Sequence, residues 1–510
     1  MPNLLDRASI VLTPTAYDDG KVLCAKPIDG SGDFDFSRNS AATRVNAQGL
    51  VEDVQILSSN LVTNGDFSNG STGWIINAWT VANGKASLDG SSPSFISQNA
   101  ILVSGKTYKV QYTVSDYVSG NVRFRANGVN GSTNVSNGVV SDLITVNSTF
   151  LSIQGFNGFE GSISNISAIE ITDDTNLPRI NYEGFSYDGS GDIIPDSGCG
   201  SWLFEPQSTN IVTYSEKFSD SSWLKLGNRS QVTDNNVISP DGTQNASKVE
   251  CIVATSNAAL RFVGLTIGVE YTFSLYAKKG NDDALKLDIS DISTDFTLTD
   301  EWMRYEITET AVANFADFAL NNASVGDFFY VWGAQIEELS YATSYIPTDG
   351  TSVTRNQDVC NNGGTGTGLI NSAEGVLYLE IARDSNDGTT GGIQINDGTD
   401  NNNLRLFFNQ TDTISVITRV GGSNNIVKTA QAITSSTAMN KFALVWKLND
   451  YKLYYNGAEL WSDTSASVYP IGTLNVIDFK NQSNPLFGKT KCLAVFPFLT
   501  DTELAELTTI

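Results

Sequence analysis

Short runs of alternating apolar and polar residues recur along most of the chain. Residues 106–114 (KTYKVQYTV) and 161–172 (GSISNISAIEIT) have the spacing of strands that turn one face to a core and the other to solvent. Turn pairs such as Asn127-Gly128 separate these runs. The pattern predicts an all-β, multi-domain chain of antiparallel β-sandwiches.

The clearest local structure is predicted near the C-terminus. Two alternating runs within residues 442–461 meet at Asn456-Gly457, a pair that favours a two-residue hairpin turn. After one more strand, Thr500 and Glu503 have the spacing of a capping box. We therefore expect a hairpin, a last strand and one short C-terminal helix.

Two segments of the chain repeat the same phrases in the same order. Residues 60–74 (NLVTNGDFSNGSTGW) align with residues 210–223 (NIVTYSEKFSDSSW). Further on, LVSGKTY and LTIGVEY place Tyr108 and Tyr271 at the start of matching alternating runs. We interpret the segments as two copies of one unit. Two copies are too few for a repeat array with a shared core, so each must bury a core of its own.

These observations divide the chain into five segments. The lead segment is too short to bury much surface alone, so we expect it to serve attachment or oligomerisation. The glycine-rich residues 361–368 (NNGGTGTG) have the composition of a flexible joint before the last sandwich. The predicted segments are 1–58 (lead segment), 59–175 (first jelly-roll sandwich), 176–205 (connector), 206–358 (second jelly-roll sandwich) and 359–510 (C-terminal sandwich).

Composition and charge exclude several classes of protein. The net charge of −25 repels phosphate backbones, so we expect no nucleic-acid partner. No apolar run approaches the length of a membrane span, and the N-terminal residues do not resemble a secretory signal. The five cysteines are scattered and odd in number, which favours reduced thiols in a protein made in a cytosol.

The chain contains no histidine, which removes catalysis by Ser-His-Asp or Cys-His groups and every zinc site that needs histidine. Catalysis by two carboxylates does not need histidine and stays open at this point. No phosphate-binding loop is apparent, because the glycines at 364–368 lack a flanking strand and helix. We expect no catalytic residues.

Several phrases resemble known virion proteins. Residues 200–223, 296–308 and 331–356, in that order, resemble the β-sandwich modules of bacteriophage tail-fibre and other virion-surface proteins, and residues 33–53 resemble the same group. The phrase that opens at Asn60 resembles the start of jelly-roll carbohydrate-binding modules. The layout of the C-terminal sandwich is similar to the concanavalin A-like, laminin-G-like lectin fold.

The resemblance implies a virion structural protein of the fibre or appendage type. It would be made in the host cytoplasm, assemble as a homo-oligomer, with a trimer favoured, join other virion proteins and present sandwiches to a host-surface glycan. One alternative is a capsid- or tail-decorating protein that binds no sugar. A second is a polysaccharide depolymerase, but the Glu-x-Asp-x-x-Glu strand motif of concanavalin-like glycosidases does not occur.

Tryptophan side chains are candidates for stacking against sugar rings. Trp74 and Trp223 occupy matching places in the repeated phrase, and Trp332 lies inside a predicted strand, so we interpret all three as structural. Trp79 and Trp461 lie near turns and are the candidate carbohydrate-binding residues. Packing in a core is the alternative for both.

We expect no cofactor, and calcium is the one ion that the sequence suggests. The resemblance implies a calcium role for Asp66, but the second copy has Glu216 or Lys217 there, which favours a turn role. Residues 385–392 and 396–403 are polar tracts suited to sugar hydroxyls or a calcium ion, with plain solvated loops as the alternative. They make the C-terminal sandwich the expected point of outside contact.

Overall fold

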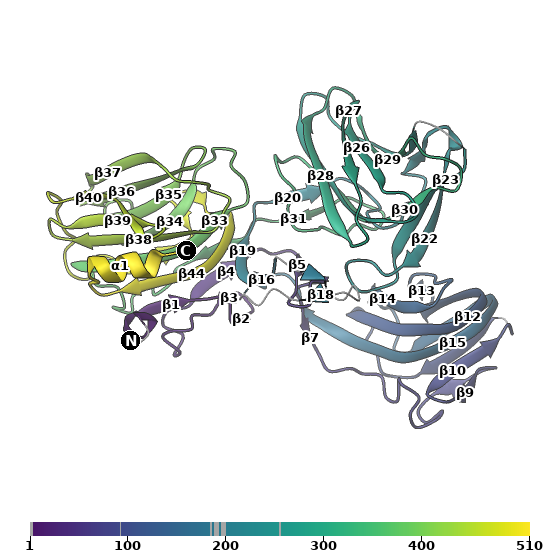
Figure 1. The fold of residues 1–510 in the computed structure, drawn as a ribbon. Helices are drawn as coiled ribbons and strands as arrows, with labels where there is room; N and C mark the ends of the chain where they lie inside the picture. Colours follow the sequence, from purple (N-terminus) through teal and green to yellow (C-terminus); the bar gives the residue numbers. More distant parts are fainter. Residues whose placement is uncertain (1–3, 92, 184–185, 188–192, 195–199, 254–256) are drawn as a thin grey trace. The chain divides into compact units, whose positions relative to one another are not determined.

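The computed structural model describes residues 4–91, 93–183, 186–187, 193–194, 200–253 and 257–510. The predicted fold class is confirmed: the strands pair antiparallel, and the described residues contain one α-helix, α1 (Asp501–Thr508). The chain forms two compact units, each discontinuous in sequence (Figure 1). Unit 1 comprises Met1–Val54, Thr175–Ser208 and Thr354–Ile510, and unit 2 comprises Gln55–Asp174 and Thr209–Val353.

The first sandwich of unit 2 is a single nine-stranded sheet folded into two layers, called its two sheets below, and two of its strands pass through both. The first half of β12 pairs with β14 on one side and with the second half of β15 on the other. The second half of β12 pairs with the first half of β15 and with β13. Strands β10 and β9 extend one sheet, and β11 and β8 extend the other. The strands are β7 (Ile56–Leu57), β8 (Ile75–Ile76), β9 (Thr80–Ala82), β10 (Lys85–Asp89), β11 (Ser94–Gln98), β12 (Thr107–Ala126), β13 (Val129–Asn130), β14 (Gly138–Thr145) and β15 (Leu151–Asp173).

The second sandwich has the same strand order in separate strands. Its sheets run β22-β23-β30-β25-β28 and β21-β24-β29-β26-β27, which match β9-β10-β15-β12-β14 and β8-β11-β15-β12-β13 of the first. Tyr108 on β12 and Tyr271 on β25 lie on equivalent strands, as predicted. The strands are β21 (Leu224–Lys225), β22 (Ser230–Val237), β23 (Ala246–Cys251), β24 (Asn257–Val263), β25 (Glu270–Lys279), β26 (Ala284–Ile289), β27 (Ile292–Thr297), β28 (Met303–Thr310), β29 (Phe315–Asn321) and β30 (Phe328–Glu337). The short elements β20 (Ser208–Asn210), η2 (Leu226–Asn228) and β31 (Val353–Arg355) complete this part of the chain.

Matching hydrogen bonds hold the two copies in the same shape. The hydroxyl of Tyr108 accepts from the backbone N–H five residues before it at 2.9 Å, and the hydroxyl of Tyr271 does the same at 3.1 Å. The indole N–H of Trp74 donates to the carbonyl of Asn64, and that of Trp223 donates to the carbonyl of Tyr214, both at 2.9 Å. The repeated phrases therefore encode equivalent anchors.

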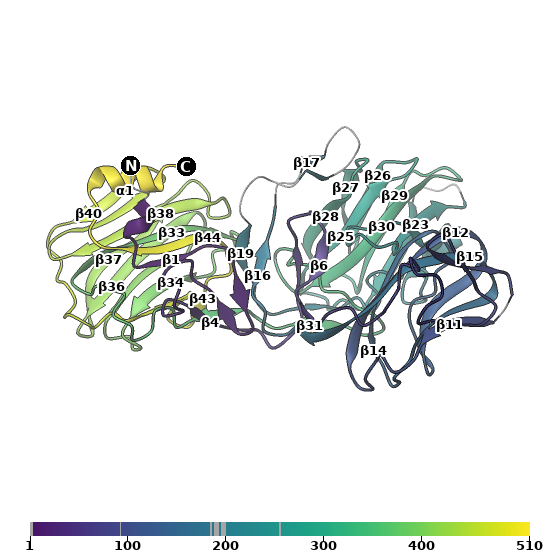
Figure 2. The ribbon, with the colours of Figure 1, turned by 90° about the horizontal axis from the view of Figure 1, so that it is seen from below.

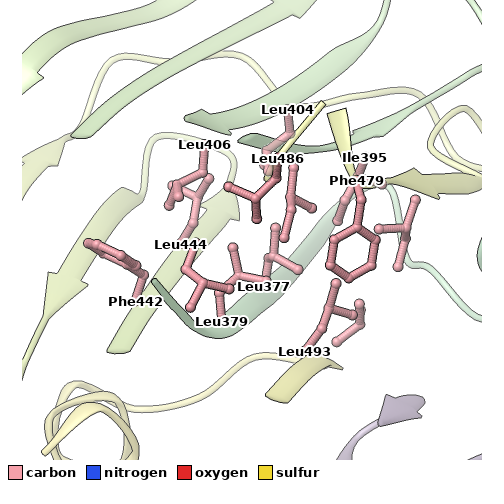
Figure 3. Packing of buried hydrophobic residues seen from close by; sticks show 14 of the residues in the cluster. Leu377, Leu379, Ile395, Leu404, Leu406, Phe442, Leu444, Phe479, Leu486 and Leu493 are labelled. Carbon is pink, nitrogen blue, oxygen red and sulfur yellow. The ribbon is translucent and has the colours of Figure 1, made fainter. Parts of the chain in front are cut away.

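Unit 1 contains the C-terminal sandwich. Its larger sheet runs β16-β19-β44-β33-β38-β39-β40, with β1 also paired to β44, and its smaller sheet runs β37-β36-β35-β34-β41. Leucine, isoleucine and phenylalanine side chains from both sheets fill the space between them (Figure 3). The main strands are β33 (Glu374–Arg383), β34 (Gly391–Asn396), β35 (Asn403–Phe408), β36 (Thr413–Val420), β37 (Ser423–Ala432), β38 (Asn440–Lys447), β39 (Tyr451–Tyr455), β40 (Ala458–Asp463), β41 (Val476–Asp478), β42 (Lys480–Asn481), β43 (Asn484–Pro485) and β44 (Gly488–Phe496).

The predicted C-terminal details are confirmed. Strands β39 and β40 pair across a turn at Asn456-Gly457. Thr500 and Glu503 form the capping box of α1, in which each residue's side chain bonds to the other's backbone N–H. The helix lies on the outer face of the larger sheet, with Leu504 buried there (Figure 2).

The lead segment and the connector do not stand apart from the C-terminal sandwich, which differs from the predicted division. Strand β1 pairs with β44, β19 pairs with β44, and β4 pairs with β32. Their apolar side chains, among them Ile10, Phe34 and Trp202, complete the same core. The elements of these segments are the 3₁₀-helix η1 (Leu4–Arg7) and the strands β1 (Ile10–Leu12), β2 (Tyr17–Asp18), β3 (Lys21–Val22), β4 (Phe34–Ser37), β5 (Thr43–Val45), β6 (Val51–Asp53), β16 (Arg179–Asn181), β17 (Ser186–Tyr187), β18 (Ile193–Ile194) and β19 (Ser201–Phe204), and the partner of β4 is β32 (Val359–Asn361).

The prediction of a flexible joint at residues 361–368 is wrong. Gly363 and Ile477 exchange two backbone hydrogen bonds of 2.9 Å, which fasten the segment to β41. A Cβ at Gly363 would lie 2.3 Å from the ring of Phe34. Glycine is needed at this position for close packing, so its presence does not indicate flexibility.

Five buried charged residues tie together the three stretches of chain that form unit 1. Asp358 accepts from Arg38 at 3.2 Å and from Arg179, while Glu205 accepts from Arg179 at 2.5 Å and from Arg355 at 2.8 Å. Removing one partner would leave a buried charge without compensation, which costs several kcal/mol. The cluster therefore fixes the stretches against one another.

Candidate functional site

One outer sheet face of the second sandwich carries aromatic and cationic side chains. Along β25, Phe273, Leu275 and Ala277 belong to the buried core. Successive residues of a strand point to opposite faces, so Tyr276 and Lys278 point outward, and both are partly exposed. The neighbouring strands β23, β28 and β30 alternate in the same way.

The rings on this face lie close together. Phe328 and Tyr330 have their ring centroids 5.6 Å apart, and Tyr276 lies 5.4 Å from the buried Trp332. In the sheet register Tyr330 is opposite Lys248 on one side and Lys278 on the other. We call this set the aromatic face: Lys248, Tyr276, Lys278, Arg304, Phe328 and Tyr330.

The cations of the aromatic face hold the rings in position. The ammonium of Lys248 lies 4.1 Å from the ring centroid of Phe328 and bonds to Glu250 at 2.6 Å. The guanidinium of Arg304 lies 5.6 Å from the ring centroid of Tyr276 and donates to the hydroxyl of Ser274 at 2.9 Å. Cation–ring contacts of this kind stabilise by roughly 0.5–1 kcal/mol at exposed sites. The rings are thus held in place without a ligand.

The same face of the first sandwich has different chemistry. The row Lys278–Tyr330–Lys248 corresponds in register to Ser115–Ser162–Ser87. The hydroxyls of Ser87 and Ser162 bond to each other at 2.9 Å. Ser87 and Ser162 thus satisfy each other, and none of the three serines offers a ring to a ligand.

The two candidate tryptophans do not have the exposure that a stacking role requires. Trp79 is 5% exposed and packs against Phe159 with ring centroids 5.8 Å apart. Trp461 is 9% exposed and lies in the core of the C-terminal sandwich. Both follow turns in the sequence, but Trp461 lies in β40 and Trp79 directly precedes β9, and both indoles belong to the buried cores. The three tryptophans interpreted as structural, Trp74, Trp223 and Trp332, are buried.

Asp66 has a turn role. Its carboxylate accepts from the N–H and the hydroxyl of Ser68, at 3.1 and 2.9 Å, and these bonds hold the pKa of Asp66 below its usual range. In the second copy, the carboxylate of Glu216 accepts from Tyr345 and Asn245, at 2.9 Å each. Within the described residues no group of three acidic or cysteine side chains is placed to hold a metal ion. Calcium binding stays a prediction.

The sequence-predicted polar tracts lie in the C-terminal sandwich mainly as loops, with their ends in β34 and β35. In residues 385–392, the carboxylate of Asp387 accepts from Arg383 at 3.0 Å and from the N–H of Thr389 at 2.9 Å. Residues 396–403 connect β34 to β35 and border a polar hollow. Of the five cysteines, Cys24, Cys251, Cys360 and Cys492 are buried free thiols, and Cys199 lies outside the described residues.

Parts of this chain are similar in structure to carbohydrate-binding modules. No family model and no curated protein matches the chain. It is similar to the CBM40 module of the Ruminococcus gnavus IT-sialidase bound to α2,3-sialyllactose, at 18% identity over 27% of this chain and 83% of that one, with a TM-score of 0.24.

Two tandem structures are also similar. They are the CBM22-1–CBM22-2 tandem of Paenibacillus barcinonensis Xyn10C (10% identity, 56% and 98% covered, TM-score 0.20) and the tandem CBM51 modules of the Streptococcus pneumoniae family 98 glycoside hydrolase (8%, 60% and 93%, TM-score 0.16). Overlaps of this extent assign neither a ligand nor a partner to this chain. Among the described residues, no helix has the length and apolar character to cross a membrane.

Proposed function

We propose that this protein binds a glycan through the aromatic face of its second sandwich. The observation that supports the proposal is the contrast between the two copies. Equivalent strands carry Lys278, Tyr330 and Lys248 in one copy and three serines in the other. Small polar groups are enough for the fold at these positions in the first copy, so the fold does not require the ring and the two cations of the second.

The chemistry of the face suits a sugar polymer. Aromatic rings offer flat apolar surface against which the C–H groups of a sugar ring can pack, and a tyrosine adds a hydroxyl that hydrogen-bonds at its edge. Lys278 is partly exposed on the outward side of β25, so its ammonium can reach hydroxyl or carboxylate groups of a glycan. Rings that are already positioned lose little conformational entropy on binding.

The test is titration of this chain with a panel of purified bacterial surface polysaccharides. We expect Tyr330→Ala to weaken binding by roughly 10- to 100-fold, as for loss of a central aromatic contact. Ser162→Ala, at the matched position of the first sandwich, should leave binding unchanged. Equal effects of the two variants, or none, would contradict the proposal.

We further propose that the setting is a bacteriophage particle, with the protein as a non-catalytic structural component of a fibre or appendage. The support is the resemblance of residues 33–53, 200–223, 296–308 and 331–356 to virion-surface proteins. These ranges contain Arg38 and Arg355 of the buried cluster, so the shared phrases include residues that the fold requires. Labelling intact particles with an antibody against this chain tests the setting. If the antibody labels particles whose protein lacks the aromatic-face side chains, and these particles still adsorb normally to host cells, the result would favour a decorating role.

A further inference from the structure

A polar hollow of about 620 Å³ opens on the C-terminal sandwich, at one edge of its smaller sheet. Strands β34 and β41 form its floor, and the loop 397–402 and the hairpin of β42 and β43 form its rim. Ligand sites commonly have volumes of roughly 300–1,000 Å³. None of the residues that line this hollow is aromatic, which sets it apart from the aromatic face.

The floor consists of buried side chains that bond to one carboxylate. Asp478 accepts from the amide of Asn396 at 2.9 Å, from the amide of Gln394 at 3.3 Å and from the backbone N–H of Asn362 at 3.0 Å. Asp478, Asn396 and Gln394 are only 5%, 2% and 6% exposed. Hydrogen bonds to a charged acceptor are stronger than neutral ones, so the floor is rigid.

The same amides fix the loops of the rim. The side-chain oxygen of Asn396 accepts from the N–H of Gly398 at 2.7 Å, and that of Gln394 accepts from the N–H of Gln482 at 3.1 Å. Across the hollow, the amide of Gln482 lies 3.4 Å from the carboxylate of Asp400. Buried groups thus hold the exposed ones in place, as in a preorganised binding site.

We propose that this hollow binds a single sugar residue, such as the terminal unit of a glycan, by hydrogen bonds alone. Asp400 can accept from two neighbouring hydroxyls. The amide of Gln482 has one N–H beyond its bond to Asp400, and the ammonium of Lys480 has further N–H groups beside its 3.7 Å ion pair with Asp478, so both can donate. Without a ring against which to stack, the hollow suits one compact polyhydroxylated ligand better than a long chain. The site is separate from the aromatic face and does not depend on it.

Saturation-transfer NMR on the full-length protein tests the proposal. The probes are the methyl glycosides of galactose, mannose and N-acetylglucosamine, each up to about 50 mM, which detects dissociation constants in the millimolar range. We expect saturable binding of at least one glycoside. In the double variant Asp400→Ala/Gln482→Ala, the affinity for that glycoside should fall at least tenfold.

Two control variants separate this site from others. Gln431→Ala, on β37 at the opposite edge of the same sheet, and Tyr330→Ala, on the aromatic face, should both bind like the unmodified protein. Addition of EDTA should change nothing, because the hydrogen-bonding groups act directly. Absence of saturable binding with every glycoside, binding that survives the double variant, or loss with EDTA would overturn the proposal.

Discussion

In the first sandwich, β12 and β15 each run without a break through both sheets, whereas in the second sandwich each of these paths is cut into two strands. The cut after β25 falls at Gly280, where a Cβ would lie 2.3 Å from the carbonyl oxygen of Phe328. The strand order is the same in both cases. Continuity of the strands is therefore not what specifies this fold.

The two copies share a small set of hydrogen-bonded anchors. Besides the tyrosine and tryptophan bonds, the side-chain oxygen of Asn60 accepts from the N–H groups of Val62 and Ala168, at 3.1 and 3.0 Å. Asn210 accepts from Val212 and Ile336, at 3.2 Å each. Each asparagine joins the first phrase of its copy to the last strand. Positions outside the anchors can differ between the copies, and the aromatic face of the second sandwich differs in this way from the serine row of the first.

The comparison predicts that the tryptophan anchors differ in strength. Trp223 packs against Phe218, Phe262 and Phe318 with centroids 5.2 to 6.2 Å apart, whereas Trp74 contacts only Phe67 among the aromatic rings described, at 5.3 Å. Replacing a buried tryptophan with alanine costs about 3–5 kcal/mol. We expect Trp223→Ala at the upper end of this range and Trp74→Ala at the lower end.

Hydrogen exchange with mass spectrometry can measure this, because peptides report on each sandwich separately. Protection should fall most within the sandwich that carries the substitution. A larger loss for Trp74→Ala than for Trp223→Ala would show that ring contacts do not set the strength of the anchor.

A second prediction concerns a pair of acids on the other sheet of the second sandwich. Asp288 and Asp317 are opposite each other on β26 and β29, whereas the corresponding sheet of the first sandwich pairs Arg123 with Gln154 at 3.1 Å. Burial raises the pKa of Asp288 to about 6. A raised pKa means that the folded state binds the proton of Asp288 more tightly than the unfolded state does. The stabilisation of the folded state by this proton is therefore fully present below pH ~4 and is lost as the pH rises through about 6.

Asp288→Asn removes this titration. We expect the variant to be more stable than the unmodified protein by about 1 kcal/mol at pH 7 and equally stable at pH 4. Melting temperatures of the two proteins at the two pH values check this. A stabilisation that is the same at both pH values would contradict the assignment to Asp288.

The smallest expected difference lies between the two tyrosine anchors. Tyr108→Phe and Tyr271→Phe each leave a backbone N–H without its acceptor, at a cost of about 1 kcal/mol. The hydroxyl of Tyr271 also donates to Glu338 at 3.1 Å, so its loss should cost slightly more. Hydrogen exchange in β12 and β25, the strands that contain the two tyrosines, measures the two costs. Equal costs would mean that the bond to Glu338 contributes nothing.

The two copies could be predicted from sequence because their anchors lie within short phrases. The tyrosine bond spans five residues and the tryptophan bond about ten, so the whole motif can be seen in one stretch of sequence. The composition of unit 1 could not be predicted in this way. Strand β1 pairs with β44 across nearly the whole chain, and nothing local to Ile10 or Leu12 indicates its partner.

The aromatic face could not be predicted from the sequence for a different reason. Residues 328–332 (FFYVW) are apolar at every position, so alternation could not tell the outward Phe328 and Tyr330 from the inward Phe329 and Val331. Trp332 lies on the outward side but is buried against Tyr345, with centroids 4.6 Å apart. The signal that was available is the pair Lys248 and Lys278, which mark outward positions on the neighbouring strands.

The most direct test of the glycan-binding account converts the second face into the first. The triple variant Lys248→Ser/Tyr330→Ser/Lys278→Ser gives the second sandwich the serine row of the first. Calorimetric titration with host-surface polysaccharide should show binding by the unmodified protein and none by the variant, while the melting temperature changes by only a few degrees. Retained binding by a folded triple variant would contradict the account.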